Sequence, residues 1–316
     1  MPKVKRVFMQ YGYGKLILFG EHFVVYGLPG IASSIGLYTR CQFHPNENGI
    51  KVRDRLTNKN ITLGENKREI LDQTMQIILR ETGLNGKSFR LEVDGDIPVF
   101  GGLGSSAALI VSIIRELNGH YALKLSDEKI NGIAFKAEHV FHGNPSGIDN
   151  TASTYRRLLW FEKNMSGGKN KIELLKLKKP LPVVIGNTKI IHDTSEAVAE
   201  VRQRKEKNPE KFDKIFAQAK ELVFKARNAL EKGNIPKTGE LINENQKLLQ
   251  EIGMGSPELD LLCKTSLENG ALGAKLTGAG MGGCMFALCP DEKTQEKVAQ
   301  AIRKKGFDSY ITSVGV

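Results

Sequence analysis

The chain has 316 residues, of which 40% are hydrophobic, and a formal net charge of +11. This length exceeds one ordinary domain of about 100–200 residues and predicts two globular domains, each with its own core. The chain contains no apolar run of about 18 residues and no signal-peptide pattern, which excludes a membrane-spanning protein and favours a cytoplasmic one without a membrane partner.

The positive charge raises the question of a nucleic-acid partner. Its clusters, such as residues 176–179 and 202–205, are not interleaved with aromatic side chains, and the chain has no nucleic-acid-binding motif. We therefore expect no nucleic-acid partner and interpret most of the charge as a solvated surface. The four cysteines are scattered without a C-x-x-C spacing, which predicts buried thiols.

The first motif spans residues 12–27. Its apolar run at residues 16–19 predicts a short strand, and Glu21 and His22 stand at the end of that strand, where polar groups commonly face a ligand. Lys15 or His22 alone would be read as a solvated or structural residue. Three ionisable side-chain types around one strand end beside glycines indicate a site.

The second motif combines a strand, a glycine-rich loop and a helix. Residues 88–94 alternate apolar and polar residues as a half-buried strand does, and a helical pattern begins near Ser105. Glycine lets the backbone approach an anion, and a helix start presents free N–H groups and a positive dipole. Ser105 and Ser106 are suited to cap the helix, bind phosphate or ligate Mg²⁺. The predicted phosphate-binding residues are Pro98, Gly101, Gly102, Leu103, Gly104, Ser105, Ser106 and Ala107.

Other readings of this loop are weaker. The loop formally fits the dinucleotide pattern G-x-G-x-x-[GA], but the preceding strand is polar on alternate residues and Pro98 intervenes. The acids Asp127 and Glu128 open a helix instead of ending the next strand, and the pattern G-x-x-x-x-G-K-[ST] is absent. A glycine-rich helix entry with serine caps remains as the purely structural interpretation.

The third motif follows an amphipathic helix that Ser126 is expected to cap. Glu138 lies near the end of this helix, and a tight turn after Gly143 carries Asp149 back toward it. Two such carboxylates suit Mg²⁺ binding and the orientation or deprotonation of a hydroxyl. Because neither cysteines nor an H-E-x-x-H order accompany His139 and His142, we interpret both as helix-surface or loop-packing residues and not as zinc ligands.

The second half of the chain begins at the prolines at positions 180 and 182. Residues 158–175 read as a hairpin before this point, and a buried strand at 183–186 follows it. Helices are predicted at 211–232, 236–251, 257–269 and 292–305, and a final strand at 308–314. We therefore predict domains at residues 1–179 and 180–316, both α+β, with a ferredoxin-like second domain.

The fourth motif, residues 273–288, consists of two short strands around a loop with four glycines in six residues. A wide hairpin turn would need fewer glycines. The excess indicates a ligand close to the backbone.

These four motifs, in this order, resemble those of the GHMP small-molecule kinases. GEHFVVYG, HGNPSGIDN and KLTGAGMGG are most similar to the mevalonate kinase branch, in its archaeal-length form, and the resemblance covers nearly the whole chain. It implies a ribosomal-protein-S5-domain-2-like N-terminal domain, a ferredoxin-like C-terminal domain and an active site between them. The implied reaction is ATP- and Mg²⁺-dependent phosphorylation of the primary hydroxyl of mevalonate, in isoprenoid precursor biosynthesis.

Residue by residue, the resemblance implies that Asp149 is the catalytic carboxylate and Lys15 its cationic neighbour. Ser106 and Glu138 match Mg²⁺ ligands, and the glycine-loop amides match the ATP phosphate site. Tyr13 departs from the usual proline before Gly-Lys. The implied contacts of the acceptor substrate are Glu21, His22, Ser146, Thr194, Gly278 and Ala279.

Two alternatives remain at this point. One is another GHMP kinase whose acceptor is phosphomevalonate or a different small alcohol. The other is a nucleotide-regulated binding protein, which would not need Lys15, Glu138 and Asp149 together. The sequence leaves open whether Asp149 is a true base or an electrostatic aligner, whether the chain is a monomer or a homodimer, which nucleotide it prefers, and whether isoprenoid diphosphates inhibit it.

Overall fold

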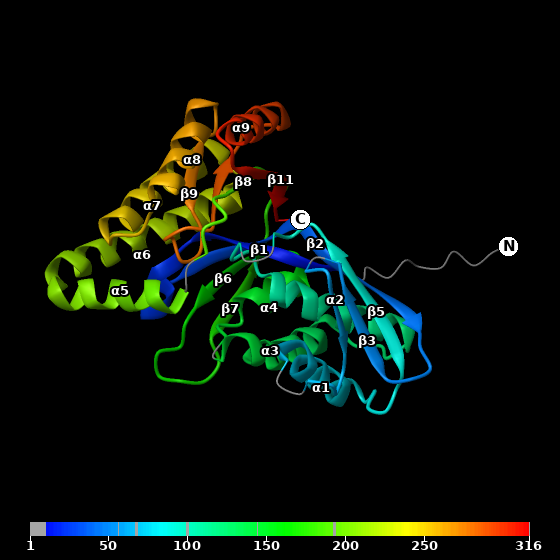
Figure 1. Ribbon diagram of the computed structural model, residues 1–316. Coiled ribbons are helices and arrows are strands. Elements are labelled where there is room, and N and C mark those ends of the chain that lie inside the picture. Colours follow the sequence, from blue (N-terminus) through cyan, green and yellow to red (C-terminus); the bar gives the residue numbers. More distant parts are fainter. Residues whose placement is uncertain are drawn as a thin grey trace. The chain divides into compact units, whose positions relative to one another are not determined.

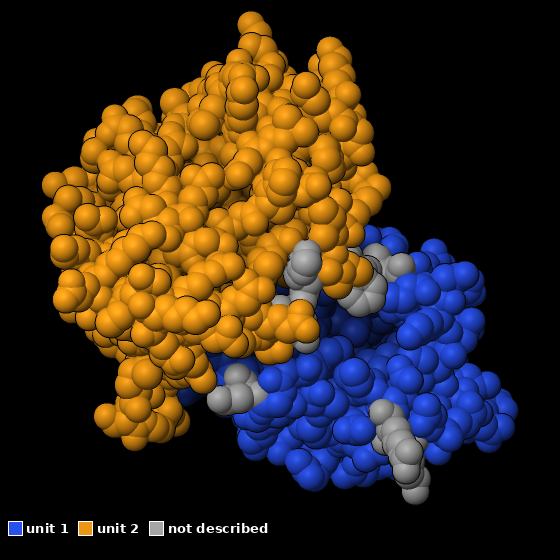
Figure 2. All heavy atoms as spheres, turned by 60° about the vertical axis from the view of Figure 1, so that its left-hand side comes forward, with its two compact units in different colours: residues 1–14, 37–99, 104–155 blue, residues 15–36, 100–103, 156–316 orange. Residues whose placement is uncertain are grey.

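The computed structural model describes residues 11–55, 57–66, 69–98, 101–143, 145–191 and 194–315 (Figure 1). The chain forms two compact units. Unit 1 contains residues 1–14, 37–99 and 104–155, and unit 2 contains residues 15–36, 100–103 and 156–316 (Figure 2). Each unit contains both helices and strands, which confirms the predicted α+β class with two domains.

The two units interleave along the chain, whereas the prediction places a single boundary between residues 179 and 180. Strands β1 (Tyr11–Phe19) and β2 (Gly30–Pro45) contribute residues to both units. β2 has 16 residues, far more than the roughly 5–6 of a common strand, so each of its ends belongs to a different unit. The boundary between the two sequential domains stays a prediction.

Unit 1 contains a sheet in the order β4-β3-β5-β2. β3 (Ile50–Asp54) runs parallel to β5 (Phe89–Gly95) and antiparallel to β4 (Lys59–Thr62), and residues 39–45 of β2 pair antiparallel with β5. The strand predicted at 88–94 is confirmed as β5. Its apolar residues are buried, and the residues between them are exposed or half-buried.

The described residues of unit 1 also form four helices. The first three pack their apolar faces against the strands in one core, which contains Met75, Ile110, Ile133 and Leu91. Ser126 caps the third helix as expected, because its side chain accepts a hydrogen bond from the amide of Lys129. The helices are α1 (Ile70–Thr82), α2 (Ser105–His120), α3 (Asp127–His142) and α4 (Ile148–Tyr155).

Unit 2 contains an antiparallel sheet in the order β2-β11-β8-β10-β9. Its last four members, numbered along the chain, stand in the order 4-1-3-2, which is the order of a ferredoxin-like sheet and confirms that prediction. These strands are β8 (Leu181–Asn187), β9 (Gly273–Leu276), β10 (Cys284–Leu288) and β11 (Asp308–Val314).

The hairpin predicted at 158–175 is confirmed as β6 (Leu158–Glu162) and β7 (Lys171–Leu175), and β6 also pairs with β2. A short 3-10 helix, η1 (Glu21–Tyr26), follows β1. The predicted helices correspond to α6 (Pro209–Lys232), α7 (Ile235–Glu251), α8 (Pro257–Glu268) and α9 (Glu292–Lys304).

Helix α5 (Thr194–Lys207) has no counterpart among the predictions. Its sequence is strongly polar, and Ala197 and Val201 are its buried apolar residues. This pair is too short a stripe to stand out as a helical period.

No helix among the described residues is long and apolar enough to cross a membrane. All four cysteines are buried, as predicted. Burial raises the pKa of the thiols of Cys263, Cys284 and Cys289 to about 12.

Candidate active site

The glycine loop leads directly into helix α2. Gly104 is the N-cap residue, with a φ of 73°, and Gly102 has a φ of 70°. Both values lie in the left-handed region that favours glycine. No described side chain caps this helix, so of the three roles that the sequence allowed for Ser105 and Ser106, capping is not the one the structure shows. A Cβ on Gly102 would find no described atom within 4 Å, so the loop is open at this point and its backbone is accessible to a ligand.

Lys15 lies on β1 and is 7% exposed. Its backbone N–H donates to the carbonyl oxygen of Leu103 at 2.8 Å, which ties the strand to the glycine loop. The fourth motif reaches the same loop, since a Cβ placed on Gly283 would lie 3.9 Å from the carbonyl oxygen of Gly101. Parts of three motifs therefore meet in unit 2.

Alternate residues of the fourth motif contact the first motif. Thr277 Oγ1 accepts from the amide of Ile17 at 3.3 Å and donates to its carbonyl oxygen at 3.2 Å. Lys275 Nζ donates to Glu21 Oε1, and His22 Nε2 bonds to the carbonyl oxygen of Ala279 at 2.8 Å. The glycine-rich loop after β9 is thus held against the turn that carries Glu21 and His22.

Glu21 and Lys275 form a buried ion pair whose two side chains are fully buried. Burial lowers the pKa of Lys275, while the neighbouring Glu21 carboxylate raises it. The second carboxylate oxygen, Glu21 Oε2, is buried and has no hydrogen-bond partner among the described residues. Only one of the two carboxylate oxygens of Glu21 therefore binds Lys275.

His22 is buried, and desolvation lowers its pKa below the usual value of 6.5. Because the carbonyl oxygen of Ala279 can only accept, Nε2 carries the proton in the neutral ring. Nδ1 is then an acceptor, buried without a partner among the described residues. Protonation of this atom would place a second N–H where those residues offer it no acceptor.

This arrangement predicts a loss of stability in acid. Below about pH 6.5, His22 of the unfolded chain takes up a proton, whereas His22 of the folded chain stays neutral because its pKa is lowered. The contribution of His22 to the free energy of unfolding is therefore complete above about pH 6.5 and is lost as the pH falls toward the pKa of the folded state. His22→Gln keeps a donor for Ala279 and cannot titrate. We expect a flatter pH dependence of the urea midpoint between pH 7.5 and 5 in this variant. The control His139→Gln, on the exposed surface of α3, should retain the wild-type slope.

In unit 1, His142 links the two residues matched to Mg²⁺ ligands. Its Nε2 lies 3.2 Å from Ser106 Oγ and 3.6 Å from Glu138 Oε2, so the hydroxyl and the carboxylate approach one point. Glu138 is 1% exposed and lies four residues before the end of α3, and Ser106 lies in the first turn of α2. His139 lies on the helix surface as interpreted from the sequence, and its Nδ1 donates to the carbonyl oxygen of Phe135. His142 has an additional role, because it contacts both Ser106 and Glu138.

Asp149 lies in the first turn of α4, where the sequence predicted a loop. Asn150 Nδ2 donates to Asn131 Oδ1 on α3 at 2.6 Å, and Thr151 Oγ1 donates to the carbonyl oxygen of Gly147. At the other end of α4, the Arg115 guanidinium donates to the carbonyl oxygen of Thr154 at 2.6 Å. A short helix clamped at both ends holds Asp149 more rigidly than a loop would.

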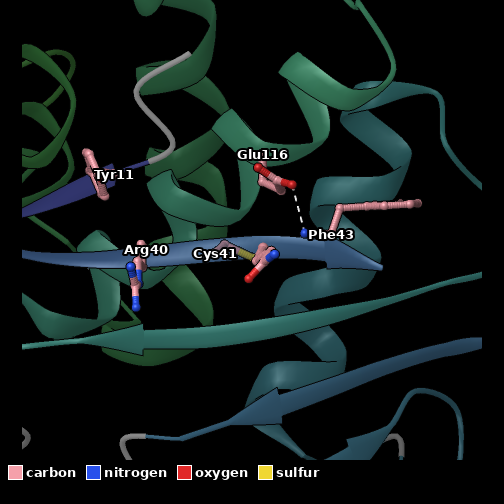
Figure 3. A pocket seen from close by; sticks show the side chains of 6 residues that line it. Tyr11, Arg40, Cys41, Phe43 and Glu116 are labelled. Carbon is pink, nitrogen blue, oxygen red and sulfur yellow. Dashed lines mark hydrogen bonds between the residues drawn. The ribbon is translucent and has the colours of Figure 1, made fainter. Parts of the chain in front are cut away.

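A separate pocket lies in unit 1 beside α2 (Figure 3). Glu116 Oε1 accepts from the amide of Phe43 at 2.7 Å, while Oε2 is buried without a partner among the described residues. Burial raises the pKa of this carboxyl. None of the motif residues lines the pocket, so it forms no part of the candidate active site. Its lining is Tyr11, Arg40, Cys41, Gln42, Phe43 and Glu116.

Two family models match the chain. The GHMP kinases N-terminal domain matches residues 69–157, and the GHMP kinases C-terminal domain matches residues 226–308. The chain belongs to the GHMP kinase family.

Relatives of this GHMP kinase include proteins named mevalonate kinase. Those of Pyrococcus horikoshii and Thermococcus gammatolerans are 38% and 35% identical to it over 95% of this chain and 93% and 94% of theirs. The crystal structure of L. major mevalonate kinase in complex with R-mevalonate is 32% identical, with a TM-score of 0.88 over 97% of this chain and 95% of that one. The Methanococcus jannaschii mevalonate kinase structure is 26% identical, with a TM-score of 0.84 over 100% of both chains. These similarities confirm the resemblance drawn from the motifs.

The remaining predicted site residues of this GHMP kinase lie in or beside loops. Gly278 has a φ of 79° in the loop after β9, and Ser146 Oγ accepts from the amide of Ile148 at the start of α4. Pro98 follows β5, and Ala107 is buried in the first turn of α2. Thr194 begins α5, but its side chain lies outside the described residues, as do Val99, Phe100, Asn144, His192 and Asp193 of the motif segments.

Lys275 is a functional candidate that the sequence motifs did not single out. It stands at the head of KLTGAGMGG, but a lysine in a strand usually reads as a solvated residue. The signal that could have singled it out is its position between apolar neighbours in a short strand whose residues are all buried.

Proposed function

We propose that this GHMP kinase transfers the γ-phosphoryl group of ATP to the primary hydroxyl of mevalonate, giving 5-phosphomevalonate and ADP in isoprenoid precursor biosynthesis. The observation that carries the proposal is its near full-length similarity to L. major mevalonate kinase, whose structure contains R-mevalonate. The similarity to curated mevalonate kinases over 95% of the chain supports the same reaction.

The residues suit phosphoryl transfer, which depends mainly on positioning and on neutralising charge. The open glycine loop and the start of α2 offer backbone N–H groups to the ATP phosphates. The backbone of Lys15 is fixed to this loop, and we assign to its side chain the role of neutralising negative charge on the transferring phosphoryl group. Asp149 aligns the primary hydroxyl and accepts its proton as the new O–P bond forms and the bond to ADP breaks.

The donor set of Ser106 and Glu138 fits Mg²⁺. A hydroxyl and a carboxylate are hard oxygen ligands, and Mg²⁺ commonly takes one or two carboxylates together with substrate phosphates. Both side chains approach one atom of His142, so one point is within reach of both. When bound, Mg²⁺ would neutralise charge on the ATP phosphate oxygens. Ser106 and Glu138 are the residues that would hold it.

This assignment predicts that Ser106→Ala and Glu138→Gln each raise the Mg²⁺ concentration needed for half-maximal rate. Each variant removes one oxygen ligand or its charge, and we expect a shift of about ten-fold or more. The measurement is a Mg²⁺ titration at saturating ATP and mevalonate. Glu128→Gln, at the exposed start of the same helix as Glu138, is the control and should titrate as the wild type does. An unchanged Mg²⁺ requirement in both ligand variants would refute the shared site.

The function itself is tested by ADP release in a coupled assay with mevalonate, phosphomevalonate, homoserine and galactose as acceptors. We expect kcat/KM for mevalonate to exceed that for each other acceptor by at least about 100-fold, because buried polar groups discriminate strongly between hydroxyl patterns. Asp149→Asn prepared in the same way controls for contaminating kinases. Comparable turnover of galactose would refute the proposal, and a preference for phosphomevalonate would identify the alternative acceptor.

The predicted cytoplasmic location, the absence of nucleic-acid and membrane partners, and the choice between monomer and homodimer stay predictions. Light scattering of the purified chain at assay concentration measures the oligomeric state directly.

A further inference from the structure

The contacts between the first and fourth motifs carry an inference about Lys275. This residue belongs to β9, which is an edge strand, because β10 is its one neighbour in the described sheet. Its ammonium group donates to Glu21 Oε1 and to the carbonyl oxygen of Leu276 at 2.8 Å. It also lies 5.4 Å from the ring centre of Phe286. The side chain is fully buried, so this charge has no contact with solvent.

The attraction between two buried charges is largely offset by the loss of their hydration, so a buried ion pair adds little net stability. Removing two charges from water carries a large desolvation cost, and an apolar pair of similar volume is often as stable. Packing alone therefore does not explain the pair. Its position indicates a role, because it fixes the carboxylate of Glu21 at the end of β1, where the motif residues predict the acceptor substrate.

Two polar atoms beside the ion pair have no hydrogen-bond partner among the described residues. Glu21 Oε2 and His22 Nδ1 are both buried acceptors without a partner among the described residues. An unsatisfied buried acceptor is destabilising, so such atoms are suited to a ligand that brings hydrogen-bond donors. Mevalonate carries two hydroxyl groups that can donate. On the proposed function, Glu21 and His22 offer acceptors of the matching kind.

We propose that Lys275 is a positioning residue for the acceptor substrate: by binding Glu21 Oε1 it orients the carboxylate so that Oε2 accepts a hydrogen bond from a substrate hydroxyl. Thr277 and Ala279 bind the flanking residues Ile17 and His22, which restrains the segment that carries Glu21. Lys275 does not touch the reacting atoms. It acts through Glu21.

The test compares Lys275→Met, Glu21→Gln and the double variant. Lys275→Met keeps most of the length of the side chain and removes its charge, which leaves Glu21 without its cation. We expect the KM for mevalonate to rise about ten-fold or more while the KM for ATP stays within about two-fold, because one substrate loses a binding group and the other does not. We also expect a lower urea midpoint, since an uncompensated charge is left buried.

The double variant separates positioning from stability. It leaves no buried charge, so its urea midpoint should recover toward the wild type, whereas its KM for mevalonate should remain high. If Lys275→Met alone does not fold, the double variant is compared with Glu21→Gln: because Lys275 acts through Glu21, both should have the same KM for mevalonate, and a higher KM in the double variant would refute the positioning role. The matched control is Arg227→Met, which removes a cation that binds Glu173 at 2.6 Å elsewhere in unit 2. It should change the urea midpoint without changing the KM for mevalonate.

This inference rests on the proposed function, and the wild-type chain in the same assay separates the two. A wild-type chain without mevalonate-dependent ADP release refutes the function. An active wild type together with a folded Lys275→Met variant of unchanged KM for mevalonate refutes the positioning role alone. Recovery of this KM in the double variant would also refute it, because the effect would then follow stability.

Discussion

Asp149→Asn is expected to lower kcat by about 10²–10⁴-fold or more while leaving the KM for ATP nearly unchanged. The substitution keeps the shape of the side chain and removes its charge, so the hydroxyl loses the carboxylate that accepts its proton, whereas ATP keeps its contacts. The clamped position of α4 strengthens the expectation, because the hydrogen bonds of Asn150, Thr151 and Arg115 do not involve the Asp149 side chain. Steady-state kinetics with both substrates measure the effect.

The control for this variant is Asp213→Asn, an exposed carboxylate that pairs with Lys205 at 2.9 Å in unit 2. It should retain the wild-type kcat, because a surface ion pair contributes little to stability and nothing to the chemistry. An Asp149→Asn variant that retains most of its kcat would place the catalytic carboxylate elsewhere in the chain.

Gly12→Ala is expected to reduce the free energy of unfolding by roughly 3 kcal/mol or more, at or beyond the upper end of ordinary overpacking. A Cβ on Gly12 would lie 1.9 Å from the carbonyl oxygen of Ala108 and 2.8 Å from its Cα. These are backbone atoms in the first turn of α2, so no side-chain rotation relieves the clash. The helix start that follows the glycine loop must move instead, and the KM for ATP should rise with the loss of stability.

The matched control is Gly132→Ala in the same unit. Gly132 lies inside α3, and its added Cβ would meet no described atom within 4 Å. Alanine is the better helix former there, so this variant should gain roughly 0.5–1 kcal/mol. Urea unfolding of both variants gives the comparison. Equal stability of Gly12→Ala and the wild type would show that β1 and α2 are packed less tightly than described.

The sequence by itself determined the elements whose cause is local. The alternation of residues 88–94 predicts β5, the period of apolar residues and the Ser126 cap predict α3, and the proline and glycine positions bound several helices of unit 2. The motifs also indicated the family, because glycine, lysine and carboxylate spacings are read along the chain. The polar helix α5 shows the limit of this reading, since a stripe of two small apolar residues gives no visible period.

Only the tertiary structure decided which of these residues meet. Lys275 and Glu21 are 254 positions apart, and Gly12 contacts Ala108 through backbone atoms that no composition or period distinguishes. The structure also shows that Gly104, and not a serine, is the N-cap residue of α2. It shows that His142 lies close to both Ser106 and Glu138. The physical reason is that hydrogen bonds, ion pairs and steric contacts act over a few ångströms in space. The sequence records separation along the chain, and folding sets the separation in space.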